Sequence, residues 1–176
     1  MIDPAIGILV IACFATLFGV SGLHKLRDPA AFGAVFAAYD LGPSRASLAV
    51  PLIELAVALG LLLGEGFRRT AAVVGILLFV TYAGAIGVNL FRGRRDLSCG
   101  CGFGNTEPIA PWMVARSLML AVLLAGTLLP WKHRDLTVID LLTIGFGLAS
   151  MSLLYLCIER LLGQTARRLD KLRSVR

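Results

Sequence analysis

Five stretches of the chain are almost entirely apolar, and each is about as long as a bilayer is thick. They cover residues 5–23, 46–64, 70–91, 110–131 and 136–158. A helix rises about 1.5 Å per residue, so roughly 20 apolar residues cross the hydrocarbon core. Backbone groups in lipid must be satisfied within their own segment, which favours helices. The pattern therefore predicts an all-α membrane protein, a bundle of five transmembrane helices in which four form the core.

A shorter apolar segment separates the first two spans. Asp28 followed by Pro29 is a typical helix start, because aspartate caps a helix N-terminus and proline fits the first turn. The apolar positions that follow have helical spacing and are Phe32, Val35, Phe36 and Tyr39. We expect a short interfacial helix on the membrane surface. Residues 1–160 would form the bundle, and residues 161–176 a basic tail that contacts anionic headgroups.

Composition and charge agree with this class of protein. Hydrophobic residues make up 57% of the chain and charged residues 16%, whereas a soluble domain has about a quarter charged. The net charge of +6 is concentrated in the tail and suits contact with the lipid bilayer. No nucleic-acid-binding module accompanies it, so no nucleic-acid partner is expected. The first span lacks the basic start of a cleaved signal peptide, and we expect it to be retained.

The polar residues of the spans gather toward one side of the membrane. Helices that alternate in direction bring together the connection after the first span, the connection after the third and the C-terminal tail; we name this side face A. His24 and Lys25 end the first span there, while Glu54 and Arg116 lie within the second and fourth. A charge inside a bilayer usually has a partner. We expect Glu54 to pair with Arg116, joined by Lys25; such a pair can also be purely structural, and His24 an ordinary interfacial residue.

Face A also carries two cysteines in the sequence DLSCGCGFGN, directly after the basic run RGRR. Cys99 and Cys101 are open to three interpretations: a zinc site, a pair of idle thiols, or thiol–disulfide exchange. Zinc needs four ligands, and the sequence supplies no matching set, so no metal site is predicted. Glycines let the loop close a strained ring and admit another protein's sulfur, and arginines stabilise the reactive thiolate. These features favour Cys99 and Cys101 as catalytic redox residues.

The two other cysteines lie within spans. Cys13 is surrounded by apolar residues and is expected to pack as a small apolar side chain. Cys157 lies near the face A end of the fifth span. It is a candidate second redox cysteine, although packing is the favoured interpretation.

Three segments occur in a characteristic order: SGLHKLRDP, then PLIELAVALGLLLG, then LFRGRRDLSCGCGFGN. This order resembles the MauE family of methylamine-utilisation membrane proteins, within the wider DoxX-like group, over residues 5–131. The resemblance implies that Cys99 and Cys101 form the redox pair and that Lys25 and Glu54 are signature polar positions. Relatives usually read Cys-Gly-Cys-Phe-Gly, whereas Gly102 is inserted here.

The resemblance also implies a cellular role. It suggests a multi-pass accessory protein of the bacterial inner (plasma) membrane that acts with a thioredoxin-like partner of the MauD type. Its client would be the small (beta) subunit of methylamine dehydrogenase, which needs disulfide formation, maturation and export. A membrane quinone is the candidate cofactor. Two other functions stay open, a non-enzymatic membrane scaffold or export factor and a quinone-linked thiol oxidoreductase.

The side of the membrane that holds the cysteines receives conflicting signals. Face A carries twelve Lys and Arg residues and the opposite face four. Positive charge favours the cytoplasm, which would place the cysteine pair inside the cell. Disulfide chemistry on exported proteins belongs outside, where thiols are not kept reduced. The family resemblance favours an extracytoplasmic pair.

Overall fold

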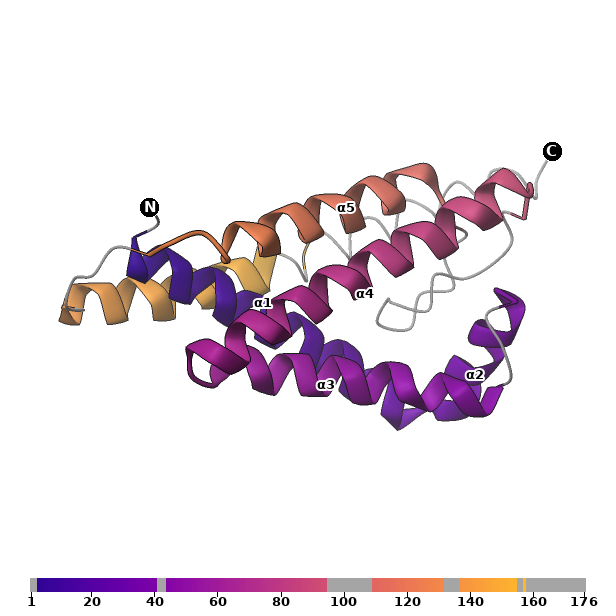
Figure 1. Ribbon diagram of the computed structural model, residues 1–176, viewed down its shortest axis with the longest axis horizontal. Coiled ribbons are helices and arrows are strands. Elements are labelled where there is room, and N and C mark those ends of the chain that lie inside the picture. Colours follow the sequence, from indigo (N-terminus) through magenta and orange to yellow (C-terminus); the bar gives the residue numbers. More distant parts are fainter. Residues whose placement is uncertain (1–2, 41–43, 95–108, 132–136, 155–156, 158–176) are drawn as a thin grey trace.

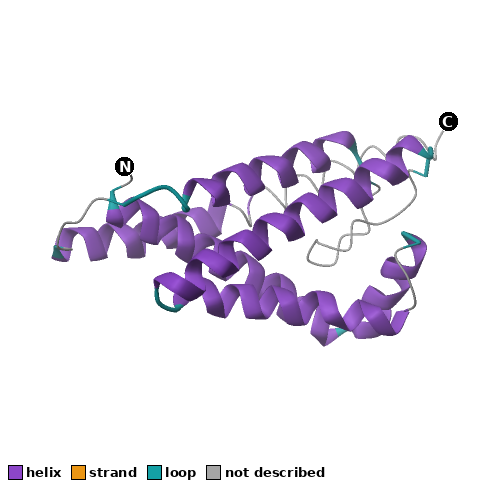
Figure 2. Ribbon diagram, viewed as in Figure 1, coloured by secondary structure: helices purple, strands orange, loops and turns teal. Residues whose placement is uncertain are grey.

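The computed structural model describes residues 3–40, 44–94, 109–131, 137–154 and 157 (Figure 1). Most of the described residues are helical, a few form turns and loops, and there is no strand among them (Figure 2). The elements are α1 (Pro4–Arg27), α2 (Pro29–Ala38), the 3-10 helix η1 (Ser44–Leu48), α3 (Ala49–Leu62), α4 (Glu65–Phe91), α5 (Pro111–Gly126) and an apolar helix Val138–Leu154. The predicted all-α class is confirmed.

Aspartates set the starts of the first two helices. Asp3 accepts a hydrogen bond from the backbone N–H of Ala5 at 3.0 Å and caps α1. Asp28 accepts from Ala31 at the same distance and caps α2, as its sequence predicts. Since Asp28 is also the residue that ends α1, the chain changes direction at this one position.

Four helices form the core. α1 packs on α3, α3 forms an antiparallel hairpin with α4, and α4 packs along α5 (Figure 1). Phe18, Leu61 and Leu124 are at most 2% exposed. The ring of Phe18 lies 5.0 Å from that of Phe79, measured between centroids. Gly75 lets Leu124 and Phe18 pack closely against α4, because a Cβ atom there would lie 2.8 Å from the Leu124 side chain and 3.2 Å from the Phe18 ring.

Two of the described helices have both the length and the apolar composition to cross a membrane, namely α1 and α4. The helices Ala46–Leu62, Pro111–Gly126 and Val138–Leu154 are apolar but shorter. The prediction of five transmembrane helices is therefore not confirmed. Apolar runs continue past the helix ends, which is why they suggested longer spans. In the fourth run the helix ends at Gly126, shortly before Pro130, and proline disfavours helix in the residue that precedes it.

The predicted helix between the first two spans is present as α2, but its larger side chains are turned toward the bundle. Tyr39, at its C-terminal end, is buried with Ile86, Ile109 and Met113, and Val35 packs against this group. The sequence of α2, PAAFGAVFAA, contains no polar side chain. A helix that is apolar on every side packs against protein or lipid, and the placement of α2 at the membrane surface stays a prediction.

Candidate functional site

A buried ion pair joins the first and third helices. Lys25, in the last turn of α1, places its Nζ 2.5 Å from Oε1 of Glu54 on α3. The two residues are 3% and 1% exposed. Each lies on the face of its helix that packs against the other helix, which brings together residues 29 positions apart in sequence.

Two hydroxyl groups complete what we name the buried polar cluster: Ser21, Lys25, Glu54 and Tyr82. Tyr82 of α4 donates a hydrogen bond to Oε1 of Glu54 at 2.6 Å, and Ser21 of α1 donates to the same oxygen at 3.2 Å. Lys25 also donates to the Tyr82 hydroxyl at 3.2 Å. The Nζ atom lies 5.2 Å from the ring centroid of Phe32 on α2. The cluster therefore contacts residues of α1, α2, α3 and α4.

The hydrogen bonds explain how the charges can be buried. Taking an ion out of water costs several kcal/mol, and an ion pair offsets that cost only when further hydrogen bonds satisfy it. Here three donors converge on one oxygen of Glu54, and the net charge of the pair is zero. Within the part of the chain that the structure describes, the other oxygen, Oε2, is buried without a hydrogen-bond partner. One acceptor position of the cluster is thus open.

Arg116 is not the partner of Glu54, so the expected Glu54–Arg116 pair is wrong. The helix that carries Arg116, α5, packs on α4, whereas Lys25 reaches Glu54 directly across the α1–α3 contact. Arg116 is half-buried, and its guanidinium lies 5.4 Å from the ring centroid of Trp112. It forms no ion pair with any described residue. His24 lies next to Lys25 in the last turn of α1 and is half-buried.

The C-terminus of α4 ends in a Schellman motif. Gly93 has a φ of 73°, in the left-handed region that glycine adopts readily. Its N–H donates to the carbonyl of Leu90, and the N–H of Arg94 donates to the carbonyl of Asn89. This turn fixes the point at which the chain leaves α4 toward the cysteine pair.

The basic run after α4 is engaged by an acidic residue at the end of α2. Asp40 accepts from Arg94 at 2.7 Å, and Arg92 approaches the same carboxylate oxygen at 3.7 Å. Arg94 also donates to the carbonyl of Ala38 at 3.4 Å. Asp40 itself has a φ of 56°, a conformation that aspartate tolerates better than most residues. We name these contacts the Asp40 link; they tie α2 to the C-terminus of α4.

The cysteines are distributed between described and undescribed parts of the chain. Cys99 and Cys101 lie outside the described residues, in the segment between Arg94 and Ile109. Cys13 is half-buried in α1, and Cys157 is an exposed free thiol. Among the described residues, no group of three or more His, Cys, Asp or Glu side chains could hold a metal ion.

Sequence reasoning missed three residues of this region: Ser21, Tyr82 and Asp40. Ser21 had a usable signal, because it precedes Lys25 by four positions and so shares its helix face. Tyr82 is the polar-tipped aromatic of an uncharged span, and a buried tyrosine hydroxyl generally needs a partner. Asp40 had no comparable signal, since its role depends on where α4 ends.

The fold and the site together define an all-helical membrane protein with a buried lysine–glutamate pair at the end of the bundle from which the cysteine segment leaves. The chain belongs to the family described as methylamine utilisation protein MauE, which matches residues 3–130.

Individual relatives agree with this family. The chain is 35% identical to the methylamine utilization protein MauE of Paracoccus denitrificans over 62% of this chain and 61% of that protein. It is 34% identical to the MauE of Paracoccus versutus, covering 94% of this chain and 91% of that protein. For the MauE of Methylophilus methylotrophus the identity is 29%, with 92% and 88% covered. No solved structure matches the chain.

Proposed function

We propose that this protein is a multi-pass inner-membrane accessory protein of methylamine utilisation that carries out thiol–disulfide exchange through Cys99 and Cys101. The family to which the chain belongs supports the role in methylamine utilisation. The observation that carries the redox role is the Cys-Gly-Cys sequence in the segment between the last turn of α4 and the first turn of α5. Only five positions separate Cys99 from Arg94, and a chain extends at most about 3.6 Å per residue. The pair is therefore tethered to this end of the bundle.

The proposed reaction is an exchange with a thioredoxin-like protein of the MauD type. A thiolate of the partner attacks one sulfur of the Cys99–Cys101 disulfide, which breaks that bond and forms a mixed disulfide. The partner's second thiolate attacks the mixed disulfide, leaving Cys99 and Cys101 as thiols and the partner oxidised. Two electrons and two protons pass to the pair. A membrane quinone, the proposed acceptor, takes both and restores the Cys99–Cys101 disulfide.

The proposed client is the small subunit of methylamine dehydrogenase. The oxidised partner would form disulfides in that subunit as it matures outside the cytoplasm, where disulfides persist. This scheme requires face A to be extracytoplasmic, in spite of its positive charge. The buried polar cluster and the Asp40 link would position the base of the cysteine segment by holding the face A ends of α1, α2 and α4 together.

Covalent trapping tests the exchange. Because exchange is reversible, the lone Cys99 thiolate of Cys101→Ser should attack the oxidised partner and remain in a mixed disulfide that reductant releases. The double variant Cys99→Ser/Cys101→Ser should form no adduct and should fail to support the dehydrogenase subunit. Cys157→Ser is the matched control, since it removes an exposed thiol that is not part of the Cys-Gly-Cys sequence.

The outcome separates the two classes of function. Normal maturation of the dehydrogenase subunit by the double variant would show that the cysteine pair is dispensable. The protein would then act as a membrane scaffold or export factor, and the exchange mechanism would be abandoned.

A further inference from the structure

Arg116 is a cation in an apolar helix, and no carboxylate of the described residues pairs with it. Its side chain is half-buried, and its Nε atom is buried without a hydrogen-bond partner in that same part of the chain. It lies five positions after Pro111, the first residue of α5, or about 7.5 Å along the helix axis. A charge among apolar groups is costly unless a partner or water reaches it. An anion from outside the described chain is therefore the complement of Arg116.

The Arg116 side chain points toward the start of α5. Side chains of a helix tilt toward its N-terminus. The guanidinium accordingly lies 5.4 Å from the ring centroid of Trp112, one turn earlier in the helix. Trp112 is exposed, and tryptophan is enriched at the level of the lipid headgroups. The cation is thus directed to the level at which lipid phosphates lie.

An exposed apolar surface continues from this cation along the same side of α5. Trp112, Arg116, Met119 and Leu123 follow one another at intervals of four, three and four residues, which places them on one side of the helix. Met119 and Leu123 are both exposed. From Trp112 to Leu123 the helix rises about 16 Å, close to the roughly 15 Å of hydrocarbon in one leaflet. We name these four residues the Arg116 stripe.

We propose that the Arg116 stripe binds one anionic phospholipid. The phosphate accepts hydrogen bonds from the guanidinium, whose planar fork of donors matches phosphate oxygens. One acyl chain lies along Met119 and Leu123. A phospholipid carries its anion at one end of a hydrocarbon chain that is one leaflet long, which is the arrangement of cation and apolar surface on the stripe. The site is independent of the proposed thiol–disulfide exchange.

The two tryptophans of the chain provide a built-in comparison. Trp131 also lies beside an arginine, since the Arg68 guanidinium is 4.2 Å from its ring centroid, but Arg68 is paired with Glu65. Trp131→Phe leaves Trp112 as the reporter, and Trp112→Phe leaves Trp131. Each variant of the full chain is reconstituted into bilayers that contain brominated phosphatidylglycerol or brominated phosphatidylcholine with identical acyl chains. Bromine quenches the fluorescence of an indole that it contacts.

Quenching of Trp112 should show an affinity for phosphatidylglycerol about fivefold above that for phosphatidylcholine, the factor expected for one arginine near the headgroups. Trp131 should show no such preference, because Glu65 already neutralises its arginine. Arg116→Gln should abolish the preference at Trp112. Arg116→Lys should retain part of it, since lysine keeps the charge and loses the fork. Arg68→Gln removes the same charge elsewhere and should leave Trp112 quenching unchanged.

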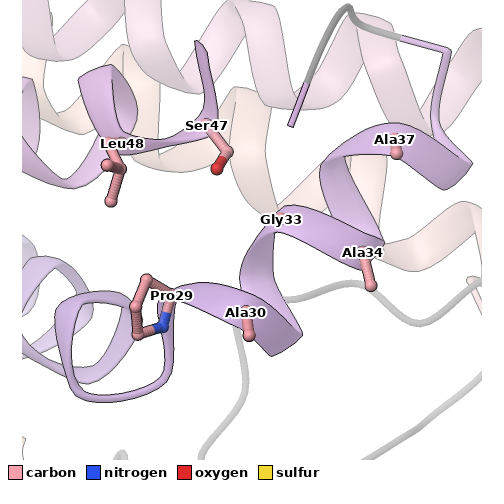
Figure 3. A pocket seen from close by; sticks show the side chains of 7 residues that line it. All are labelled: Pro29, Ala30, Gly33, Ala34, Ala37, Ser47 and Leu48. Atoms are coloured by element: carbon pink, nitrogen blue, oxygen red, sulfur yellow. The ribbon is translucent and has the colours of Figure 1, made fainter. Parts of the chain in front are cut away.

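The open groove between α2 and η1 is another surface that could take a hydrocarbon chain (Figure 3). Its volume is about 440 Å³, and its described lining residues include no charged side chain. Ala34 is an exposed residue of this lining, so Ala34→Leu narrows the groove. This variant should keep the phosphatidylglycerol preference at Trp112. Loss of the preference in Ala34→Leu would place the lipid in the groove and overturn the assignment to the stripe.

Three further results would contradict the proposal. A preference at Trp112 that survives Arg116→Gln would show that this cation does not hold the lipid. An equal preference at both tryptophans would reduce the effect to the overall positive charge of the protein. Removal of the preference by inorganic phosphate at constant ionic strength would indicate a free-anion site.

Native mass spectrometry in a neutral detergent gives a second readout with both tryptophans in place, should Trp131→Phe fail to fold. Arg116→Gln should lower the affinity for phosphatidylglycerol about fivefold relative to Arg68→Gln, with phosphatidylcholine binding unchanged. Equal retention of phosphatidylglycerol by the two variants would overturn the proposal.

Discussion

Glu54 is a buried carboxylate with three hydrogen-bond donors around it. Its carboxylate lies within an apolar helix, yet Lys25, Tyr82 and Ser21 all reach one of its oxygens. An ion pair of this kind adds little net stability compared with an apolar pair of similar volume. We infer that it supplies specificity, because a wrong packing of α1 on α3 would leave a charge unpaired in the bundle.

Replacing Glu54 should therefore destabilise the bundle strongly. Glu54→Gln leaves the Lys25 ammonium buried without a counter-charge, and breaking a buried pair in this way costs about 3–5 kcal/mol. We expect a lowered midpoint of thermal unfolding in detergent. Glu65→Gln is the control, since Glu65, whose side chain is 78% exposed, pairs with Arg68 at 3.2 Å, and a pair with an exposed partner contributes about 0–1 kcal/mol.

The double variant Lys25→Met/Glu54→Leu should recover most of the stability that Glu54→Gln loses, because it removes both charges and keeps apolar volume. A function that stays lost in this stable double variant would show that the pair does more than hold helices. If Glu54→Gln unfolds at the wild-type temperature, the carboxylate is not buried as described.

Tyr82→Phe isolates the contribution of the phenol hydroxyl. The variant removes a donor to Glu54 and an acceptor for Lys25 while keeping the ring. Leaving buried polar groups short of a partner costs about 1–3 kcal/mol, and the unfolding midpoint should fall accordingly. The adjacent Thr81→Val is the control, since its hydroxyl is exposed and bonds only to its own helix at Leu77. Equal effects of the two substitutions would remove Tyr82 from the cluster.

The candidate site could be predicted from the sequence only in part. A charge in an apolar span is conspicuous, which is why Glu54 and Lys25 stood out. The partner of Glu54 could not be predicted, because the depth of a residue along its helix does not tell which other helices pack against it. Arg116 lies at a suitable depth but on a helix that packs against α4. Tyr82 was overlooked because an aromatic residue in an apolar span ordinarily packs as an apolar one.

At the scale of elements, the helices could be predicted and their ends could not. Apolar runs located the α-helices that the structure describes, but α4 begins at Glu65, upstream of the uncharged run that starts at residue 70. A helix can continue beyond the hydrocarbon with Arg68 and Arg69 in its first turns, and hydropathy does not register this. Local capping signals were more reliable, as Asp28 shows, because the side chain and the backbone donors it satisfies are neighbours in sequence.

The Asp40 link gives a prediction at this scale. Its ion pairs are largely exposed, so Asp40→Asn should lower the free energy of unfolding by only about 0.2–1 kcal/mol per pair. Asp40→Ala should cost about 1 kcal/mol more than Asp40→Asn, because alanine tolerates the positive φ of 56° less well than asparagine. Unfolding midpoints of the two variants at low and high salt would measure both the contribution of the ion pairs and that of the positive φ. A larger loss for Asp40→Asn than for Asp40→Ala would contradict this account of the turn.

At the scale of the whole molecule, the functional proposal depends on which side of the membrane each end of α4 occupies. This helix has 27 residues and a length of about 40 Å, enough to cross a bilayer with turns to spare. An exposed phenylalanine with neighbouring arginine stands at each end: Phe67 is 68% exposed and Phe91 is 97% exposed. Arginines near the ends of a span place their charged groups at the two membrane–water interfaces.

Thiol labelling at these two positions should report the sidedness of the protein. In a chain whose native cysteines are replaced by serine, Phe67→Cys and Phe91→Cys should react with a membrane-impermeant maleimide from opposite sides of sealed vesicles. Because Phe91 lies eight residues before Cys99, the side that labels Phe91→Cys is also the side of the cysteine segment. The proposed exchange requires that side to be extracytoplasmic, so Phe91→Cys should label in intact spheroplasts and Phe67→Cys only after lysis. Labelling of both from one side would mean that α4 does not span the membrane, whereas cytoplasmic labelling of Phe91→Cys would preserve the bundle and exclude a periplasmic client.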